Sequence, residues 1–282
     1  MKKTFTILAL SAATGISALA GNITVKGSDT LVILAQKWAE VYMGQHNDVK
    51  IQVSGGGSGI GFAALQNQTT DLCDASRKIK PAEQSKCAAV FAGGLRPTEY
   101  KVALDGLSIY VNAENPVKEL TLDQLKGIFT GKVKNWKEIG GTDAPITVYS
   151  RENSSGTYEF FKEHVLKGQD FAASAQTMPG TAAILQAVTK DKNGIGYGGA
   201  AYGAGAKHLS VKKTDASPAV EPTEENVISG TYPIWRHLYV YVNPNLDKGE
   251  IAAYLNWIRS DDGQKIVKDV GYYPLPKNLR SN

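Results

Sequence analysis

The segment that decides the fold is SRENSSGT, residues 150–157, because a strand is expected to end and a helix to begin within it. The preceding residues 145–149 (PITVY) are rich in the β-branched and aromatic side chains that strands favour. In the following residues 158–166, apolar side chains recur at helical spacing. The segment therefore predicts a strand, a polar turn and a helix, which is half of a βαβ unit.

The same segment has the groups that capture an oxyanion. The first turn of the helix is predicted at residues 155–157, where backbone N–H groups are free and the helix dipole is positive. Arg151 adds a permanently charged, forked donor, and Ser155 and Thr157 add hydroxyls. Serine and threonine also cap ordinary helices, so capping alone is the alternative interpretation. Repetition of the pattern elsewhere in the chain favours binding.

Two further turns of this kind follow short predicted strands. The turn GSDT at residues 27–30 follows the strand at 23–25, and SGGGSGIG at residues 54–61 follows the strand at 49–53. Each precedes a predicted helix, and the glycines let backbone N–H groups approach a ligand closely. The glycine run does not fit G-x-G-x-x-G, and no Walker-type Gly-Lys-Ser/Thr occurs, so a nucleotide-binding fold is the weaker alternative.

A fourth candidate turn is DASR at residues 74–77. It comes at the end of the predicted strand 71–73 and precedes a helix that Pro81 could begin. Ser76 and Arg77 are therefore candidates for the same site. An arginine after a strand is more often a solvated surface residue, and for Arg77 both interpretations stay open.

Residues 1–20 have the pattern of a secretory signal peptide. They begin with MKK, continue with a largely apolar stretch at 5–13 and end with ALA before Gly21. No cysteine lies near the cleavage point, and no later apolar run is long enough to span a membrane. We expect a soluble protein outside the cytoplasm, most simply in a periplasm.

The charged and metal-binding residues exclude several functions. Without the two lysines of the signal peptide, the 31 basic residues become 29 against 27 acidic ones, which argues against nucleic acid or an anionic membrane as partner. The four histidines form no ligand array, so no metal and no other cofactor is expected. No Gly-x-Ser-x-Gly elbow is followed by a well-placed acid and histidine. Cys73 and Cys87, the two cysteines, are predicted to form a disulfide in an oxidising compartment.

Strand and helix signals alternate along the chain, which predicts mainly parallel sheets flanked by helices. Long strands are predicted at residues 102–111 and 235–242, with a second α/β run between them. This order predicts two α/β domains joined by a two-strand hinge, with the ligand in the cleft between them. The predicted division is a signal peptide at 1–20, a discontinuous domain at 21–105 plus 236–282, and a second domain at 106–235.

With these motifs the chain resembles the periplasmic phosphate-binding proteins of high-affinity phosphate ABC transporters. Arg151 followed by Ser155, Gly156 and Thr157 matches the phosphate-binding Arg-x-x-x-Ser-Gly-Thr motif of that family. Supporting matches span nearly the whole chain and include GSDTL at 27–31, DASR at 74–77, LKGIFTG at 125–131, GIGY at 194–197 and GYYPL at 271–275. The resemblance implies a two-lobed type II periplasmic-binding fold. Such a protein closes on one phosphate and delivers it, as a monomer, to a membrane permease.

The predicted phosphate site combines hydroxyl, backbone and arginine groups from all four turns. Its residues are Ser28, Asp29, Thr30, Leu31, Ser58, Ser76, Arg77, Arg151, Ser155, Gly156 and Thr157. Leu31 is expected to contribute its backbone N–H only.

Two departures from the family pattern bear on selectivity. Many members have an aspartate where this chain has Arg77, and a carboxylate where it has Asn153. Such a carboxylate accepts the proton of hydrogen phosphate, which sulfate lacks. Our hypothesis is that Asp29 supplies the acceptor, with Asp74 as second candidate; a helix N-cap is the alternative role for Asp29.

Other functions remain possible for this sequence. The same fold could bind another tetrahedral oxyanion, such as sulfate, molybdate or arsenate. A secreted phosphatase with a serine or threonine nucleophile is a further alternative, but no base stands beside a nucleophile and the chain is not expected to be an enzyme. A surface or adhesive role in addition to phosphate binding is also compatible with the sequence.

Overall fold

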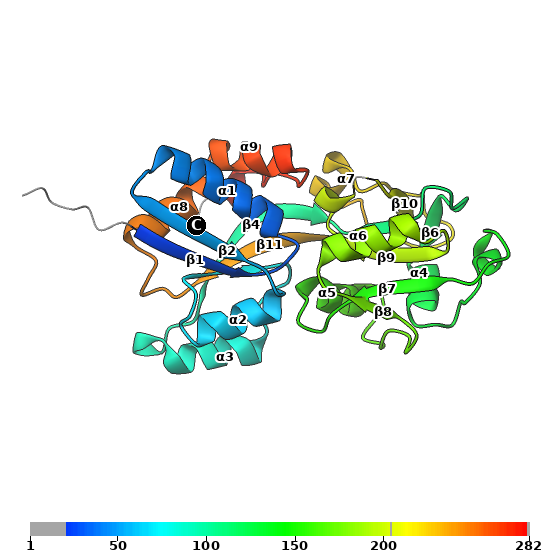
Figure 1. Cartoon of the computed structure of the whole chain (residues 1–282), viewed down its shortest axis with the longest axis horizontal. Helices are drawn as coiled ribbons and strands as arrows, with labels where there is room; N and C mark the ends of the chain where they lie inside the picture. The colour runs from blue at the N-terminus through cyan, green and yellow to red at the C-terminus, as the bar shows by residue number, and fades with distance from the viewer. Residues whose placement is uncertain (1–20, 204, 281–282) are drawn as a thin grey trace, which may run out of the picture.

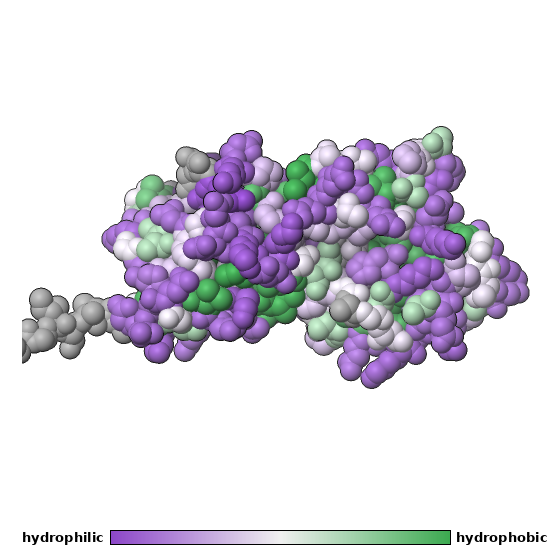
Figure 2. All heavy atoms as spheres, turned by 90° about the horizontal axis from the view of Figure 1, so that it is seen from above, coloured by the Kyte–Doolittle hydropathy of each residue, from purple (hydrophilic) through white to green (hydrophobic). Residues whose placement is uncertain are grey.

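The structure, a computed structural model, describes residues 21–203 and 205–280. The predicted signal peptide at residues 1–20 lies outside the described residues. The molecule is elongated, with two lobes side by side along its long axis (Figure 1). Hydrophilic residues cover much of the face seen in Figure 2, with hydrophobic residues in smaller patches between them. No helix in the described part of the chain combines the length and apolar character needed to cross a bilayer.

The first lobe contains a five-stranded sheet with the strand order β2-β1-β3-β11-β4. β1 is parallel to β2 and β3, whereas β11 is antiparallel to β3 and β4. The strands are β1 (Gly21–Gly27), β2 (Val49–Ser54), β3 (Leu72–Ala75), β4 (Thr98–Gly106) and β11 (Trp235–Val242). The helices are α1 (Val32–Gln45), α2 (Ser58–Gln66), α3 (Pro81–Val90), α8 (Gly249–Arg259) and α9 (Asp261–Val270), with 3-10 turns at Ala92–Gly94 and Lys277–Leu279.

The second lobe contains a six-stranded sheet with the order β6-β10-β5-β9-β7-β8. Its strands are β5 (Ser108–Val111), β6 (Glu119–Thr121), β7 (Thr147–Arg151), β8 (Gln176–Met178), β9 (Gly194–Gly198) and β10 (Lys207–Lys212). Its helices are α4 (Leu122–Phe129), α5 (Gly156–His164), α6 (Thr181–Lys190) and α7 (Glu224–Ile228), with 3-10 turns at Trp136–Ile139 and Ala200–Tyr202. β7 is parallel to β8 and β9, and β5 is antiparallel to β9 and β10. The predicted α/β class is confirmed.

The chain crosses between the sheets in two neighbouring places. The single strand predicted at 102–111 is divided: β4 ends at Gly106 in the first sheet, and β5 begins at Ser108 in the second. The return crossing comes just before β11. The backbone N–H of Leu107 donates to the carbonyl of Ile234 at 2.8 Å, so the two crossings lie side by side.

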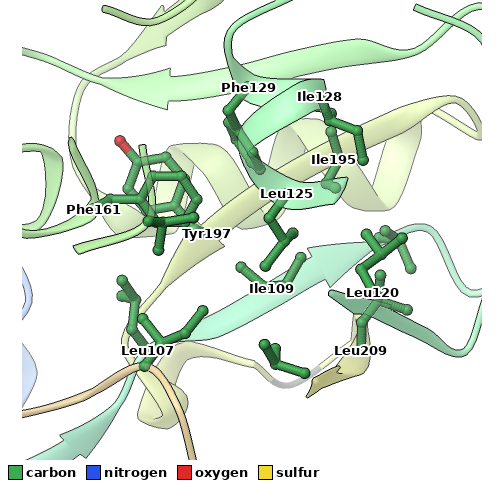
Figure 3. Close-up of a cluster of buried hydrophobic side chains, with 14 of the residues drawn as sticks. Leu107, Ile109, Leu120, Leu125, Ile128, Phe129, Phe161, Ile195, Tyr197 and Leu209 are labelled. Carbon is green, nitrogen blue, oxygen red and sulfur yellow. The ribbon is translucent and has the colours of Figure 1, made fainter. Parts of the chain in front are cut away.

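Each lobe has its own hydrophobic core. In the first, one face of α1 packs against the sheet, because Leu34, Trp38 and Tyr42 recur at helical spacing and are almost fully buried. In the second, leucine, isoleucine and aromatic side chains from α4, α5 and the sheet meet, among them Ile109, Phe129, Phe161 and Tyr197 (Figure 3). Each of the two sheets therefore packs against a core of its own.

The predicted disulfide is wrong: Cys73 and Cys87 are both buried free thiols. Cys73 on β3 and Cys87 on α3 pack in an apolar cluster with Phe62 and Tyr241. Burial, followed by the charge of Glu83, raises the pKa of the Cys87 thiol to about 11, so the group stays protonated. A buried, protonated cysteine behaves as a small apolar residue, and an even number of cysteines does not by itself indicate a bond.

Candidate anion-binding site

The four predicted turns meet between the lobes. Three of them belong to the first lobe: the turn at 27–30 follows β1, the turn at 54–61 precedes α2, and the turn at 74–77 lies at the end of β3. Because β1 and β3 are parallel neighbours, their carboxyl ends lie at the same edge of the sheet. The fourth turn connects β7 to α5 in the second lobe. Gly59 N–H donates to the carbonyl of Ser154 at 2.9 Å, which links the start of α2 directly to this turn. The lobes are therefore in contact at the predicted site.

Five buried hydroxyls converge there, and we refer to Ser28, Thr30, Ser58, Ser76 and Thr157 as the hydroxyl cluster. None exposes more than 2% of its surface. Ser28 Oγ donates to Ser76 Oγ at 2.8 Å, and Ser76 Oγ lies 3.3 Å from Ser58 Oγ and 3.4 Å from Thr157 Oγ1. Thr30 and Thr157 share a 2.8 Å hydrogen bond between the lobes. Such a dry group of rotatable hydroxyls can turn its hydrogens toward an anion.

The backbone at the start of α5 lies against this cluster. A Cβ atom added to Gly156 would stand 2.3 Å from Ser58 Oγ and 2.7 Å from Ser76 Oγ, so only glycine fits. Ser155 caps α5, because its Oγ accepts from the N–H groups of Thr157 and Tyr158 at 3.2 and 3.3 Å. Ser155 is therefore the N-cap of α5, as in the alternative interpretation. Gly156 lets the N-terminus of the helix approach the hydroxyls closely.

Gly156→Ala is expected to weaken anion binding more than a hundredfold, because the methyl group would occupy space that the Ser58 and Ser76 hydroxyls use. Overpacking of a tight site costs roughly 1–3 kcal/mol, and displacement of the binding hydroxyls adds to it. Titration calorimetry with phosphate measures the loss. Gly44→Ala is the matched control, since its added Cβ meets no atom within 4 Å. An unchanged affinity in Gly156→Ala would show that the anion does not contact this turn.

Arg151 is the buried cation of the site, with its side chain 1% exposed. All three of its nitrogens have partners: Nε donates to Glu152 at 2.9 Å, Nη1 to Thr181 at 3.0 Å, and Nη2 to Asp29 at 2.7 Å. Three of its five N–H groups are used, which leaves two for a ligand. Because Asp29 belongs to the first lobe, this ion pair also links the lobes.

Asp29 connects three segments and does not cap α1. Its Oδ1 accepts from the N–H of Gly56 at 2.8 Å, and its Oδ2 accepts from Arg151. Its backbone carbonyl accepts from the Tyr202 hydroxyl of the second lobe at 2.6 Å. The cap of α1 is Leu31, without a side-chain hydrogen bond, and the Leu31 N–H donates to the Ser28 carbonyl at 3.0 Å. The backbone N–H of Leu31, which the sequence predicted to bind the anion, is therefore already used in a hydrogen bond within the turn.

Arg77 lies next to the cluster but its guanidinium is held elsewhere. Nη1 and Nη2 form a two-pronged ion pair with Glu83 at 2.8 and 2.7 Å. Its charged carbon also stands over the Phe62 ring, 4.9 Å from the centroid. The structure does not bring this side chain together with the hydroxyl cluster.

The arginine that does contact the cluster is Arg236, on β11, which sequence reasoning missed. Its Nη2 donates to Thr157 Oγ1 at 3.0 Å and its Nη1 to the Ser76 carbonyl at 2.9 Å. Nε and Nη2 both donate to Asp105 on β4, at 3.0 and 2.8 Å. Arg236 and Asp105 are each under 5% exposed. The available signal in the sequence was a charged residue within a strand that is otherwise expected to be buried, because charged residues are rarely buried without a role.

Comparisons with known proteins agree with this geometry. A family model described as a PBP superfamily domain matches residues 12–262. The phosphate-binding protein PstS of Pseudomonas aeruginosa is 38% identical over 280 residues, covering 93% of this chain and 86% of that protein. The PstS of Staphylococcus epidermidis is 36% identical over 267 residues, covering 92% and 80%. This chain belongs to the PstS family.

Solved structures extend the agreement to the fold of the PstS family. A phosphate ABC transporter substrate-binding protein of Clostridium perfringens, determined with bound phosphate, superposes with a TM-score of 0.83 at 30% identity. The match covers 91% of this chain and all of that one. The two-lobed type II periplasmic-binding fold implied by the sequence resemblance is thereby confirmed.

Asp74, the second proton-acceptor candidate in this PstS family member, lies in the core of the first lobe. Residues alternate along β3, so Asp74 shares the face of Leu72, which packs with Tyr254 and α1, while Cys73 and Ala75 face α2 and α3. Burial raises the pKa of Asp74 to about 7, and its charge contributes to a raised pKa of Tyr254. The backbone carbonyl of Asp74 accepts from the Ser28 N–H at 2.9 Å, whereas its carboxyl lies on the core face of β3, close enough to Tyr254 to affect its pKa.

The raised pKa of Asp74 predicts a specific pH dependence of stability. The folded protein keeps the proton of Asp74 up to about pH 7, whereas the unfolded chain releases it near the ordinary aspartate pKa of 3.8. The contribution of the raised pKa to the free energy of unfolding is therefore fully present below pH 3.8 and is lost as the pH rises to 7. The Asp74→Asn variant has no carboxyl to titrate and does not show this loss. Between pH 4 and pH 8 its free energy of unfolding should therefore rise relative to that of the wild type, by at most about 4 kcal/mol. Urea unfolding at several pH values measures the difference; a constant difference would contradict the assignment.

Proposed function

We propose that this chain binds inorganic phosphate between its two lobes and delivers it, as a monomer, to the membrane permease of an ABC transporter. The observation that carries the proposal is the buried hydroxyl cluster, which is drawn from both lobes, is contacted by Arg236 and includes the two neighbours of Asp29, the residue that Arg151 binds. Its position at the start of α5 adds a helix N-terminus. Names of the relatives, which are phosphate-binding proteins, support the same ligand.

The anion would be held mainly by neutral donors. Arg236 contacts the cluster and Arg151 binds the adjacent Asp29, but three carboxylates already pair with these two cations: Asp29, Glu152 and Asp105. The bound dianion therefore meets little net positive charge. Hydroxyl and backbone donors in a buried site can replace the hydration shell of the anion.

Selectivity for phosphate would come from Asp29. Both its oxygens already accept one hydrogen bond, and each carboxylate oxygen has a second lone pair available. Hydrogen phosphate can donate its proton to such an oxygen, whereas sulfate offers only lone pairs and charge. We therefore retain Asp29 as the proposed proton acceptor and set Asp74 aside because of its place in the core.

Closure of the two lobes is the proposed route to binding and release. We place the hinge at the paired crossings, and divide the chain into a first domain of residues 21–105 plus 236–282 and a second of 106–235. Direct bonds between the lobes, such as Thr30 to Thr157 and Asp29 to Arg151, would form on closure. Residues 1–20 would direct export to the periplasm, where the proposed permease receives its ligand.

The test is titration calorimetry of the mature, phosphate-free protein with phosphate and then sulfate, at two pH values on either side of the second phosphate ionisation. Tight one-to-one phosphate binding without sulfate binding is the expected result. Binding of sulfate alone, or of molybdate or arsenate in preference to phosphate, would replace the proposed ligand. Turnover of a phosphomonoester by the pure protein would replace transport with catalysis.

A further inference from the structure

A cavity lies between the lobes next to the hydroxyl cluster, because one of its lining residues, Arg236, also donates to Thr157. It has a volume of about 410 Å³ and is lined by residues 77–81, one face of α5 and the first half of β11; we call it the β11 pocket. Pockets that hold small organic molecules have volumes of roughly 300–1,000 Å³. Figure 1 shows α5 at the edge of the second lobe that faces the first, with β11 running between them. The pocket therefore has one wall from each lobe.

Three aromatic side chains contribute to walls that are otherwise mainly charged, histidine and aliphatic. Phe160 from α5 and Trp235 and Tyr239 from β11 line the space, and Phe160 and Tyr239 are buried. The Arg236 guanidinium carbon stands 5.3 Å from the centre of the Phe160 ring, so charge and aromatic surface alternate. A flat, apolar body would be favoured between such walls.

Two nitrogens of lining residues have no hydrogen-bond partner. In residues 21–203 and 205–280, the buried side-chain nitrogens and oxygens without one are Arg77 Nε, His237 Nε2 and Arg259 Nε. The first two residues both line the β11 pocket, and Arg77 is only 9% exposed. Buried polar atoms are nearly always paired in folded proteins, so Arg77 Nε, which can only donate, lacks an acceptor, while the Nε2 of neutral His237 can donate or accept according to its tautomer.

The charges around the pocket favour a negative group. Arg77, Lys80 and Arg236 are neutralised by Glu83, Glu159 and Asp105 respectively, whereas exposed Lys78 has no ion pair within the described residues. Burial lowers the pKa of His237 to about 4, with further contributions from Lys101 and Lys78. Exposed Glu163 is the one carboxylate on the rim, at the α5 side.

We propose that the β11 pocket binds a small aromatic carboxylate, with its ring between Phe160, Trp235 and Tyr239 and its carboxylate toward Arg77 and Lys78. The carboxylate would supply the acceptor that Arg77 Nε lacks. A charge-assisted hydrogen bond of this kind is about twice as strong as a neutral one. The shape of the aromatic walls gives the ligand class, and the arginine and lysine give its charge.

Occupancy of this pocket should strengthen phosphate binding. A ligand that needs walls from both lobes binds best when the lobes are together, and so does phosphate under the proposed function. By thermodynamic reciprocity each ligand must then raise the affinity for the other by the same factor. Arg236 gives a direct connection, because it lines the pocket and donates to Thr157. Only this coupling rests on the proposed function; the binding of the carboxylate does not.

The probe is benzoate, with uncharged benzamide as the matched ligand control. Calorimetry with the mature protein is expected to give a benzoate Kd of about 1 mM or tighter, which a ligand of this size can reach, and benzamide should bind at least tenfold more weakly. In ¹H–¹⁵N spectra the indole N–H of Trp235 should shift, while those of Trp38, Trp136 and Trp257 stay in place. The Trp235→Phe variant assigns the signal.

Lys78→Glu tests the pocket without touching the phosphate site. It should weaken benzoate binding about tenfold and leave phosphate binding in the absence of benzoate unchanged. Lys50→Glu, at an exposed position on β2, makes the same charge change outside the pocket and should have no effect on either ligand. Saturating benzoate should tighten phosphate binding at least threefold. Absence of benzoate binding, or equal binding of benzamide, would overturn the proposal even if phosphate binds; absence of phosphate binding alone would overturn only the proposed function.

Discussion

Replacement of Arg151 with methionine is expected to weaken phosphate binding about a thousandfold. Removal of one partner from a buried ion pair costs roughly 3–5 kcal/mol, and about 4 kcal/mol corresponds to that factor. Here the loss is compounded, because Asp29 and Glu152 would remain beside the anion without their shared cation. Calorimetry measures the affinity.

Two further variants make the result for Arg151 specific. Ser28→Ala removes one neutral hydroxyl and is expected to weaken binding about tenfold, the effect of a typical hydrogen bond. Arg151→Lys keeps the charge but cannot contact Asp29, Glu152 and Thr181 at once, so its loss should fall between the other two. Circular dichroism and thermal unfolding separate lost binding from lost folding. Equal losses in folded Arg151→Met and Ser28→Ala would refute the leading role of Arg151.

The fold was predictable where local pattern decides it. The strand and helix signals around residues 27–30 and 150–157 fixed the βα units, since their spacing depends on a few adjacent residues. The division of residues 102–111 at Leu107 was not predictable, because the whole stretch is apolar and β-prone. The break depends on a tertiary contact, the hydrogen bond from Leu107 to Ile234. The strand β11 was predicted at residues 235–242, but its position between β3 and β4 was not, because its partners on those strands come about 130 to 170 residues earlier in the chain.

The two arginines show where site prediction from sequence stops. Arg77 follows a strand and precedes a helix, as Arg151 does, yet Glu83 at the start of α3 holds its guanidinium. Arg236 has no such motif around it, and it reaches the cluster because Asp105, on the adjacent strand, orients it. Residue type and local spacing identified the turns correctly. Which arginine contacts these turns depends on Glu83 and Asp105, because they hold the two guanidinium groups and their positions follow from the fold.

The second large effect is expected from Asp29→Asn, which should relax discrimination against sulfate by up to about 10⁴-fold, the factor by which a site built on a buried hydrogen bond rejects an analogue that lacks it. The asparagine oxygen can still accept from Gly56 N–H. Its amide then faces Arg151 with a donor in place of an acceptor, so phosphate binding should weaken as well. Competition of sulfate against phosphate in calorimetry measures the ratio of the two affinities.

Glu152→Gln is the matched control for this prediction. It neutralises the other carboxylate on the same guanidinium, at Nε, and leaves Asp29 in place. If a proton acceptor decides selectivity, Asp29→Asn admits sulfate and Glu152→Gln does not. If negative charge near Arg151 decides it, both variants admit sulfate to a similar extent. Both forms of phosphate on either side of its second ionisation keep a proton, so an acceptor at Asp29 should let the wild type bind phosphate and reject sulfate at both pH values, whereas Asp29→Asn should admit sulfate at both.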